Sequence, residues 1–161
     1  MDRYDQLGSE PPEFVVAAND AAHRGDGAHT IERHGPDIPL SRDPNTRTIE
    51  GRIYGDPPWS RPENWSYRWT DPSTMNRTVN DYLKQNWETI RTYLAMDEEY
   101  NGSFDARHRV GQGYYNEGMY GAGPINSHYA ETSFVKIRIR LTSGADLTKP
   151  FLVTAFPSGL L

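Results

Sequence analysis

Histidines are the side chains of this chain best suited to acid–base chemistry. A histidine changes charge near neutral pH, so it can accept or donate a proton under physiological conditions. The 161 residues contain five of them, namely His23, His29, His34, His108 and His128. For His23 and His108 we expect solvated rings, whereas His29 and His34 fall in one short segment, HTIERH. Cysteine is absent, which excludes a cysteine nucleophile, a thiolate metal site and a disulfide framework.

A run of cations near the C-terminus is a second feature with chemical potential. The residues of TSFVKIRIRL alternate as in a β-strand, so Lys136, Arg138 and Arg140 share one face and an apolar set occupies the other. From residue 106 onward the chain carries six Lys or Arg against three Asp or Glu, although its formal net charge is -5. This face suits an anionic substrate; the alternative is a solvated face whose charges oppose aggregation.

The sequence predicts neither a metal ion nor a cofactor. No His or carboxylate spacing matches a helical HxxxH or HExxH motif or a calcium loop, and the run Asp97, Glu98 and Glu99 fits a solvated helix end. The glycines of VGQGYYNEGMYGAGP lack the strand, loop and helix context of a nucleotide site and predict a β-hairpin or bulged edge instead. No run of roughly 20 apolar residues predicts a membrane helix.

One long helix and one antiparallel hairpin are the elements that would position these groups. Apolar residues recur every three or four positions from Val79 to Leu94, which predicts an amphipathic core helix over about 74–96. Asp71, Ser73 or Thr74 can cap its first turn, and Asn101-Gly102 is expected to end the region that follows.

The hairpin is predicted from TSFVKIRIRL and KPFLVTAF, which alternate in the strand manner on either side of a turn. In its second strand, strict alternation puts Phe151, Val153 and Ala155 on one face and Leu152, Thr154 and Phe156 on the other. Thr154 is then expected beside the cationic face of the first strand.

The remaining segments complete an α+β fold. We expect residues 1–13 to form a linker or arm and residues 14–161 a single domain, in which an N-terminal helical part with the long amphipathic helix packs on a C-terminal twisted antiparallel sheet. Six prolines and three tryptophans between residues 35 and 72 predict a long aromatic-rich loop, with a short strand at 48–54.

Several of these pieces together suggest a family. HTIERHG, RTIEG, the single amphipathic helix, VGQGY and the terminal VTAFP resemble the C-terminal toxin domains of bacterial polymorphic and contact-dependent inhibition systems, particularly the RNase A-like toxin family. The resemblance spans about residues 28–157. It implies a compact α+β ribonuclease without disulfides, whose substrate is RNA, with tRNA as one candidate.

The same resemblance implies a setting and partners. Such a domain is delivered by the producing bacterium as part of a larger protein and acts in the cytoplasm of the target cell. We therefore expect a monomer that forms a heterodimer with a cognate immunity protein, with no membrane segment in this part.

For the site, the resemblance implies a catalytic histidine matching His34 and a downstream arginine matching Arg47. It also places a threonine and a tyrosine in the last strand, which correspond to Thr154 and Phe156. Phe156 has no hydroxyl group, so the role of that tyrosine is not filled here. Lys136, Arg138 and Arg140 would then bind the substrate.

Metal-independent RNA cleavage, in which the ribose 2′-OH attacks and leaves a 2′,3′-cyclic phosphate, needs a base, a phosphate-stabilising group and an acid. His34 suits the base, Arg47 offers a bidentate fork, and Thr154 can donate a hydrogen bond to a phosphoryl oxygen. The general acid is unassigned, and its candidates are His29, His128 and Tyr129. On an ideal helix His29 would lie about 140° away from His34.

Two other functions fit parts of the sequence. The chain could be a different toxin enzyme, such as an ADP-ribosyltransferase, which would require NAD. It could also be a non-catalytic protein-binding module whose aromatic loop docks a partner. The tryptophans of that loop, interleaved with Arg61 and Arg68, could alternatively stack on bases or anchor the loop.

Overall fold

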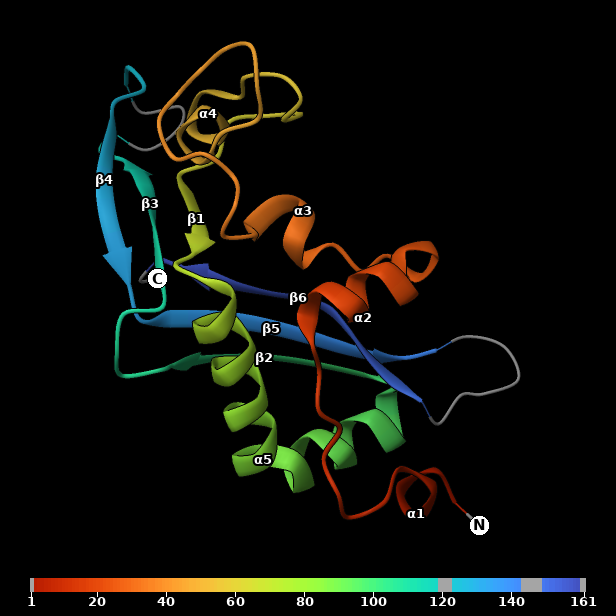
Figure 1. Ribbon diagram of the computed structural model, residues 1–161. Coiled ribbons are helices and arrows are strands. Elements are labelled where there is room, and N and C mark those ends of the chain that lie inside the picture. The colour runs from red at the N-terminus through yellow and green to blue at the C-terminus, as the bar shows by residue number, and fades with distance from the viewer. Residues whose placement is uncertain (1, 119–122, 143–148, 160–161) are drawn as a thin grey trace.

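The computed structural model describes residues 2–118, 123–142 and 149–159. Its helices are α1 (Arg3–Leu7), α2 (Val16–Ala22), α3 (Thr30–His34), α4 (Ile49–Tyr54) and α5 (Pro72–Asp97), with a short 3-10 turn, η1 (Arg24–Asp26). Its strands are β1 (Trp65–Trp69), β2 (Glu99–Asp105), β3 (Gly111–Asn116), β4 (Ser127–Thr132), β5 (Phe134–Leu141) and β6 (Pro150–Ser158). This arrangement confirms the α+β class (Figure 1).

Helix α5 is the helix predicted from the apolar repeat. Its N-cap is Asp71, one of the three predicted capping residues, whose side chain accepts a hydrogen bond of 2.7 Å from the backbone N–H of Thr74. Pro72 follows at the first helical position, where its missing N–H leaves no donor unsatisfied. The apolar stripe is buried in the main core, as predicted, and consists of Met75, Val79, Leu83, Trp87, Ile90 and Leu94.

Replacing Asp71 by Ala removes this cap, and we expect the free energy of unfolding to fall by about 1 kcal/mol in chemical denaturation at neutral pH. The hydrogen bonds from Thr74 hold the pKa of Asp71 below its usual value. The stabilisation is therefore present at pH values above the ordinary carboxyl pKa and is lost as the pH falls through the lowered pKa. In acid, the free energies of unfolding of the wild type and Asp71→Ala should become equal. Asp81→Ala, at an exposed position of the same helix, is the control. Equal losses in both variants would contradict a capping role.

The strands form two three-stranded antiparallel sheets, with orders β2-β5-β6 and β1-β3-β4. Figure 1 shows the β1-β3-β4 sheet standing at one end of the other sheet, with α4 beside it. Helix α5 starts beneath β1 and runs across the β2-β5-β6 sheet towards the bottom of the view. The pairing of β5 with β6 confirms the predicted hairpin. The expectation that Asn101-Gly102 ends a region was wrong, because these residues lie inside β2 and pair with Arg138 and Ile137 of β5.

A β-bulge changes the predicted alternation of β6. Thr154 pairs with Arg138, as expected for a residue beside the cationic face, but the register shifts between Arg138 and Ile139, which pairs with Leu152. Leu152 therefore lies in the main core, on the opposite face from Thr154. The prediction that these two residues share a face was wrong, because one extra residue is inserted between them.

The outer edge of β6 is covered by side chains and backbone from the N-terminal helices and β1. Asn19 of α2 makes two hydrogen bonds to the backbone of Leu152, at 2.8 and 3.0 Å. The backbone N–H of His29 donates to the Val153 carbonyl, and Thr30 Oγ1 accepts from the Ala155 N–H, both at 3.0 Å. These bonds satisfy an otherwise exposed strand edge and fix where α3 begins.

The first residues lie along α5. Arg3 donates a hydrogen bond to the Ala95 carbonyl, Arg91 donates to the Tyr4 carbonyl, and the Trp87 indole donates to the carbonyl of Gly8. The boundary between an arm, 1–13, and a domain, 14–161, stays a prediction. Within the described residues, no helix has the length and apolarity that crossing a membrane requires.

Candidate active site

His34 is the last residue of α3 and is almost fully buried, with 6% of its surface exposed. Its ring stacks on Phe156 of β6 with a centroid distance of 4.5 Å and an interplanar angle of 15°. Its Nδ1 lies 3.1 Å from the backbone carbonyl of Tyr67 in β1. The segment HTIERH therefore delivers a histidine that is held from both sides by the two sheets.

These surroundings determine the protonation state of His34. A carbonyl oxygen only accepts hydrogen bonds, so Nδ1 must carry the proton and Nε2 is left with a lone pair. Burial lowers the pKa of His34 to about 3, and the nearby charge of Arg52 is the next largest cause. The ring is thus neutral at pH 7, in the tautomer that a general base acting through Nε2 requires.

A cavity of about 310 Å³ opens beside the His34 ring, and we call it the His34 cavity. It is lined by His29, Arg33, His34, Arg52, Glu63, Trp65, Ser66, Tyr67, Lys136, Phe156, Pro157, Ser158 and Gly159. Four of the residues predicted from the sequence thus meet here, namely His29, His34, Lys136 and Phe156. The cavity combines two histidines with three cationic side chains, a composition suited to an anionic substrate.

The position of His29 differs from what an ideal helix would give. His29 is the N-cap residue of α3, with φ -151°, so it lies outside the helical turn and the angle of an ideal helix does not apply to it. Its Nδ1 lies 2.8 Å from the Gly27 carbonyl oxygen and so donates a hydrogen bond to it. His29 and His34 border the same cavity, and the charge of His29 contributes to the low pKa of His34.

A second cavity, of about 450 Å³, adjoins the first, and we call it the arginine cavity. It is lined by Glu32, Arg33, Arg47, Arg52, Pro58, Trp59, Ser60, Arg61 and Glu63. Arg33, Arg52 and Glu63 border both cavities. Arg47, predicted as the catalytic arginine, borders this second cavity, where it donates a 2.8 Å hydrogen bond to the Glu32 carbonyl.

Arg52 is a functional candidate that sequence reasoning missed. It lies on α4, its guanidinium is 4.7 Å from the centre of the Trp59 ring, and it makes no ion pair with a carboxylate among the described residues. Burial lowers its pKa and the charge of Glu63 opposes this, while Arg33, Arg61 and Arg47 lower the pKa further. A half-buried guanidinium crowded by like charges is poised to bind an anion.

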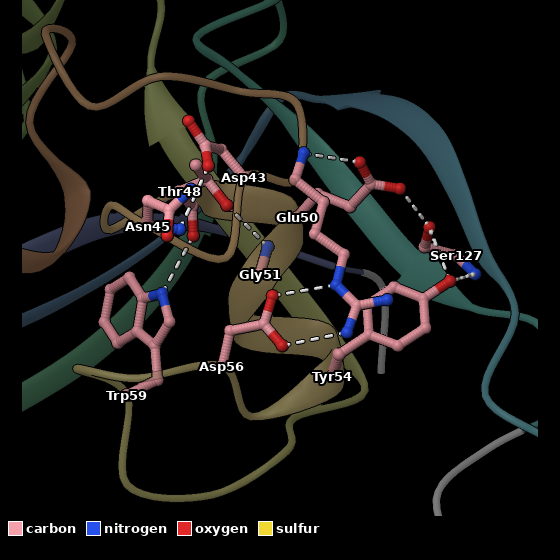
Figure 2. A network of polar contacts seen from close by, with 10 residues as sticks. Asp43, Asn45, Thr48, Glu50, Gly51, Tyr54, Asp56, Trp59 and Ser127 are labelled. Carbon is pink, nitrogen blue, oxygen red and sulfur yellow. Dashed lines mark hydrogen bonds and ion pairs between the residues drawn. The ribbon is translucent and has the colours of Figure 1, made fainter.

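Helix α4 replaces the short strand predicted at 48–54. Thr48 has extended backbone angles, and its hydroxyl accepts a 2.8 Å hydrogen bond from the Gly51 N–H, as an N-cap does. The indole of Trp59 donates to the Thr48 carbonyl at 2.8 Å, which ties the following loop to the start of the helix (Figure 2). The β-branched residues that suggested a strand thus lie at a cap and on the buried face of a helix.

Figure 2 also shows how α4 is anchored on both sides. Arg42 reaches Asp56 through two hydrogen bonds of 2.8 and 2.9 Å, and its guanidinium lies 3.9 Å from the centre of the Tyr54 ring. Glu50 accepts hydrogen bonds from the Arg42 N–H and from the Ser127 hydroxyl of β4. The network holds the helix that carries Arg52 against the β1-β3-β4 sheet.

Two predicted residues lie on the cationic face of the sheet but do not line either cavity. Thr154 is buried, and its hydroxyl has no hydrogen-bond partner among the described residues. Arg138, opposite Thr154, forms an ion pair with Glu99 of β2. The predicted contact between Thr154 and the cationic strand is present, but the structure does not bring Thr154 to the edge of the His34 cavity.

The other predicted residues lie farther from His34. Arg140 donates a 2.6 Å hydrogen bond to the Asp26 carbonyl and borders a different surface hollow. Tyr129 on β4 is half exposed and accepts a hydrogen bond from Gln112, and His128 pairs with Glu117 at 2.9 Å. Across the described ranges, no three His, Asp or Glu side chains form a group that could hold a metal ion.

The fold has a counterpart among solved structures. A chain of the CdiA-CT/CdiI complex from Y. kristensenii 33638 superposes with a TM-score of 0.55 at 15% sequence identity, over 82% of this chain and 100% of that chain. At this level of identity the likeness establishes a shared fold. The chain matches no protein-family model and no curated protein.

Proposed function

We propose that this chain is a metal-independent endoribonuclease toxin domain that acts between competing bacteria. The observation that carries the proposal is His34, a neutral histidine whose Nε2 keeps its lone pair, at the edge of a cavity lined by Arg33, Arg52 and Lys136. RNA cleavage of this kind needs a neutral base to remove the 2′-OH proton and cations to stabilise the phosphorane.

Each step has a candidate residue in the His34 cavity. His34 Nε2 takes the proton of the ribose 2′-OH, while Arg52 and Lys136 stabilise the negative charge that develops on the phosphoryl oxygens. Binding of a phosphate offsets the charge of Arg52, which is one cause of the low pKa of His34, so the bound substrate strengthens the base. The products are a 2′,3′-cyclic phosphate and a free 5′-hydroxyl.

We assign the general acid to His29 in its imidazolium form, which donates its Nε2 proton to the departing 5′-oxygen and keeps its Nδ1 proton on the Gly27 carbonyl. Both histidines border one cavity, but His34 is buried and neutral whereas His29 is only half buried. Such different environments allow one histidine to act as the base and the other as the acid. The assignment does not depend on Phe156, which lacks a hydroxyl and instead stacks on the base. Thr154 and Arg47 keep their predicted phosphate roles as hypotheses outside this minimal set.

The shared fold supports a proposal for the biological setting. The CdiA-CT/CdiI complex gives a precedent for a chain of this fold in a two-protein complex. We accordingly propose that the domain is delivered into a target cell as part of a larger protein, and that the producing cell makes an immunity protein that binds it. RNA, with tRNA as one candidate, is the proposed substrate.

Incubation of the purified protein with total RNA in EDTA tests the function directly. We expect discrete fragments that end in 2′,3′-cyclic phosphate, and growth arrest when the protein is expressed without its partner. Transfer of label from NAD to a protein or nucleic acid would favour an ADP-ribosyltransferase. Absence of RNA cleavage, NAD transfer and growth arrest would favour a binding module, and either outcome would overturn the proposal.

Replacing His29 by Ala tests the acid. On RNA we expect the cleavage rate to fall by about 10²- to 10⁴-fold, the usual contribution of a general acid. On uridine 3′-(p-nitrophenyl phosphate) the loss should be much smaller, because p-nitrophenolate leaves without being protonated. An equal loss on both substrates would show that His29 has a different role.

A further inference from the structure

The arginine cavity holds more positive charge than its own carboxylates neutralise. Four arginines, Arg33, Arg47, Arg52 and Arg61, border it together with Glu32 and Glu63. Arg47 lies 3.7 Å from the Glu32 carboxylate, and Arg61 forms a 3.0 Å ion pair with Glu63. Arg33 and Arg52 form no ion pair with a carboxylate among the described residues, although the charge of Glu63 acts on Arg52. The cavity therefore has an excess of two positive charges.

The Trp59 ring contacts two of these arginines. The guanidiniums of Arg47 and Arg52 lie 5.0 and 4.7 Å from the centre of its ring, within the range of cation–π contacts. The indole is in turn fixed by its hydrogen bond to the Thr48 carbonyl (Figure 2). Both forks are thus held against one ring before any ligand binds, which reduces the entropy lost on binding.

The two cavities are neighbours that share part of their wall. Arg33, Arg52 and Glu63 border both, so an anion in the arginine cavity lies next to an anion beside His34. Guanidinium forks match the oxygens of a phosphate, and the volume of about 450 Å³ falls within the range of small-molecule sites.

We propose that the arginine cavity is a second phosphate subsite, which binds the phosphate adjacent to the scissile one on the same RNA strand. The proposal deepens the ribonuclease function and rests on it. It gives Arg47 and Arg61 a role in holding the strand, whereas Arg52 touches both phosphates. The minimal efficient substrate is then a dinucleotide that carries one additional phosphate.

Cleavage of short substrates tests this subsite. A dinucleoside monophosphate is compared with the same molecule bearing a terminal phosphate, at its 5′ end in one substrate and at its 3′ end in another. We expect the phosphate at one end to raise kcat/KM by about tenfold or more, as a charge-assisted hydrogen bond does. In Arg61→Ala the ratio of kcat/KM with the terminal phosphate to kcat/KM without it should fall towards one. Arg77→Ala, an exposed α5 arginine bonded to Ser73, is the matched control and should keep the gain.

Binding to a catalytically impaired variant separates this inference from the ribonuclease proposal. In His34→Asn, inorganic pyrophosphate should bind about tenfold more tightly than inorganic phosphate, and Arg61→Ala should remove the difference. Arginine-dependent pyrophosphate binding, together with a wild-type protein that cleaves no RNA, would support the anion site and overturn the ribonuclease function.

The opposite results overturn the subsite. Cleavage with no gain from either terminal phosphate would show that RNA does not occupy the arginine cavity. An acidic partner protein that binds the wild type but not Arg61→Ala, with the substrate gain unchanged in that variant, would likewise overturn the subsite, because the cluster would then serve a protein interface.

Discussion

Replacing His34 by Asn is expected to reduce RNA cleavage by about 10²- to 10⁴-fold, the contribution typical of a general base. The substitution is matched to the geometry, because the asparagine amide can still donate a hydrogen bond to the Tyr67 carbonyl, as Nδ1 does at 3.1 Å. What it removes is the lone pair of Nε2. The measurement is the rate of appearance of 2′,3′-cyclic phosphate under single-turnover conditions.

His108→Asn is the control for that experiment. His108 is exposed and its Nδ1 lies 2.9 Å from the Ala106 carbonyl, so the same chemical change is made at a histidine with the same kind of backbone contact. It should leave the cleavage rate unaltered, and both variants should unfold at temperatures close to that of the wild type. Cleavage by a folded His34→Asn protein within tenfold of the wild type would remove His34 from the role of base.

Periodicity predicted the elements that are both long and amphipathic. Helix α5 and the β5-β6 hairpin each repeat their apolar pattern often enough to determine a period. The pattern did not predict β2, where Asn101-Gly102 looks like a terminator, because pairing with β5 outweighs the local preference of two residues. For helix α4 the local preference misleads in another way, because the β-branched Thr48 favours a strand in the sequence but caps a helix in the structure.

The segments HTIERH and RTIEG both border the cavities, through His29, Arg33 and His34 of the first and Arg47 of the second. The sequence predicts Arg47 as the catalytic arginine, whereas the structure places Arg52, five residues later, between the two cavities. Which arginine faces His34 depends on the anchoring of α4 by Asp56 and Ser127, and these contacts join positions that no local pattern connects. Arg33 was overlooked although it directly precedes His34.

The tautomer of His34 is another property that the sequence does not carry. It depends on a backbone carbonyl 33 residues away and on stacking against the last strand. The role of Phe156 is likewise visible only in the structure. The family resemblance implies a tyrosine at this position, and Phe156 lacks its hydroxyl group. In the structure the Phe156 ring packs on His34 and contributes to the burial that keeps His34 neutral.

Replacing Arg52 by Gln is expected to have the second largest effect, a loss of about 10²- to 10³-fold in the rate of cleavage, comparable to loss of one preorganised donor to a developing oxyanion. Glutamine keeps a polar side chain able to donate hydrogen bonds but carries no charge and no fork. Arg77→Gln, on the exposed face of α5, makes the same change away from both cavities and should cleave RNA at the wild-type rate.

A titration of His34 distinguishes a direct role of Arg52 from a structural one. The charge of Arg52 is the largest cause of the low pKa of His34 after burial, so its removal should raise that pKa, observable by NMR of the imidazole ring. A folded Arg52→Gln protein with slow cleavage and a raised His34 pKa would show that the guanidinium acts electrostatically on the base and its substrate. Slow cleavage with an unchanged pKa would mean that Arg52 does not face His34, and the phosphate role would return to Arg47, whose guanidinium also lies within cation–π distance of Trp59.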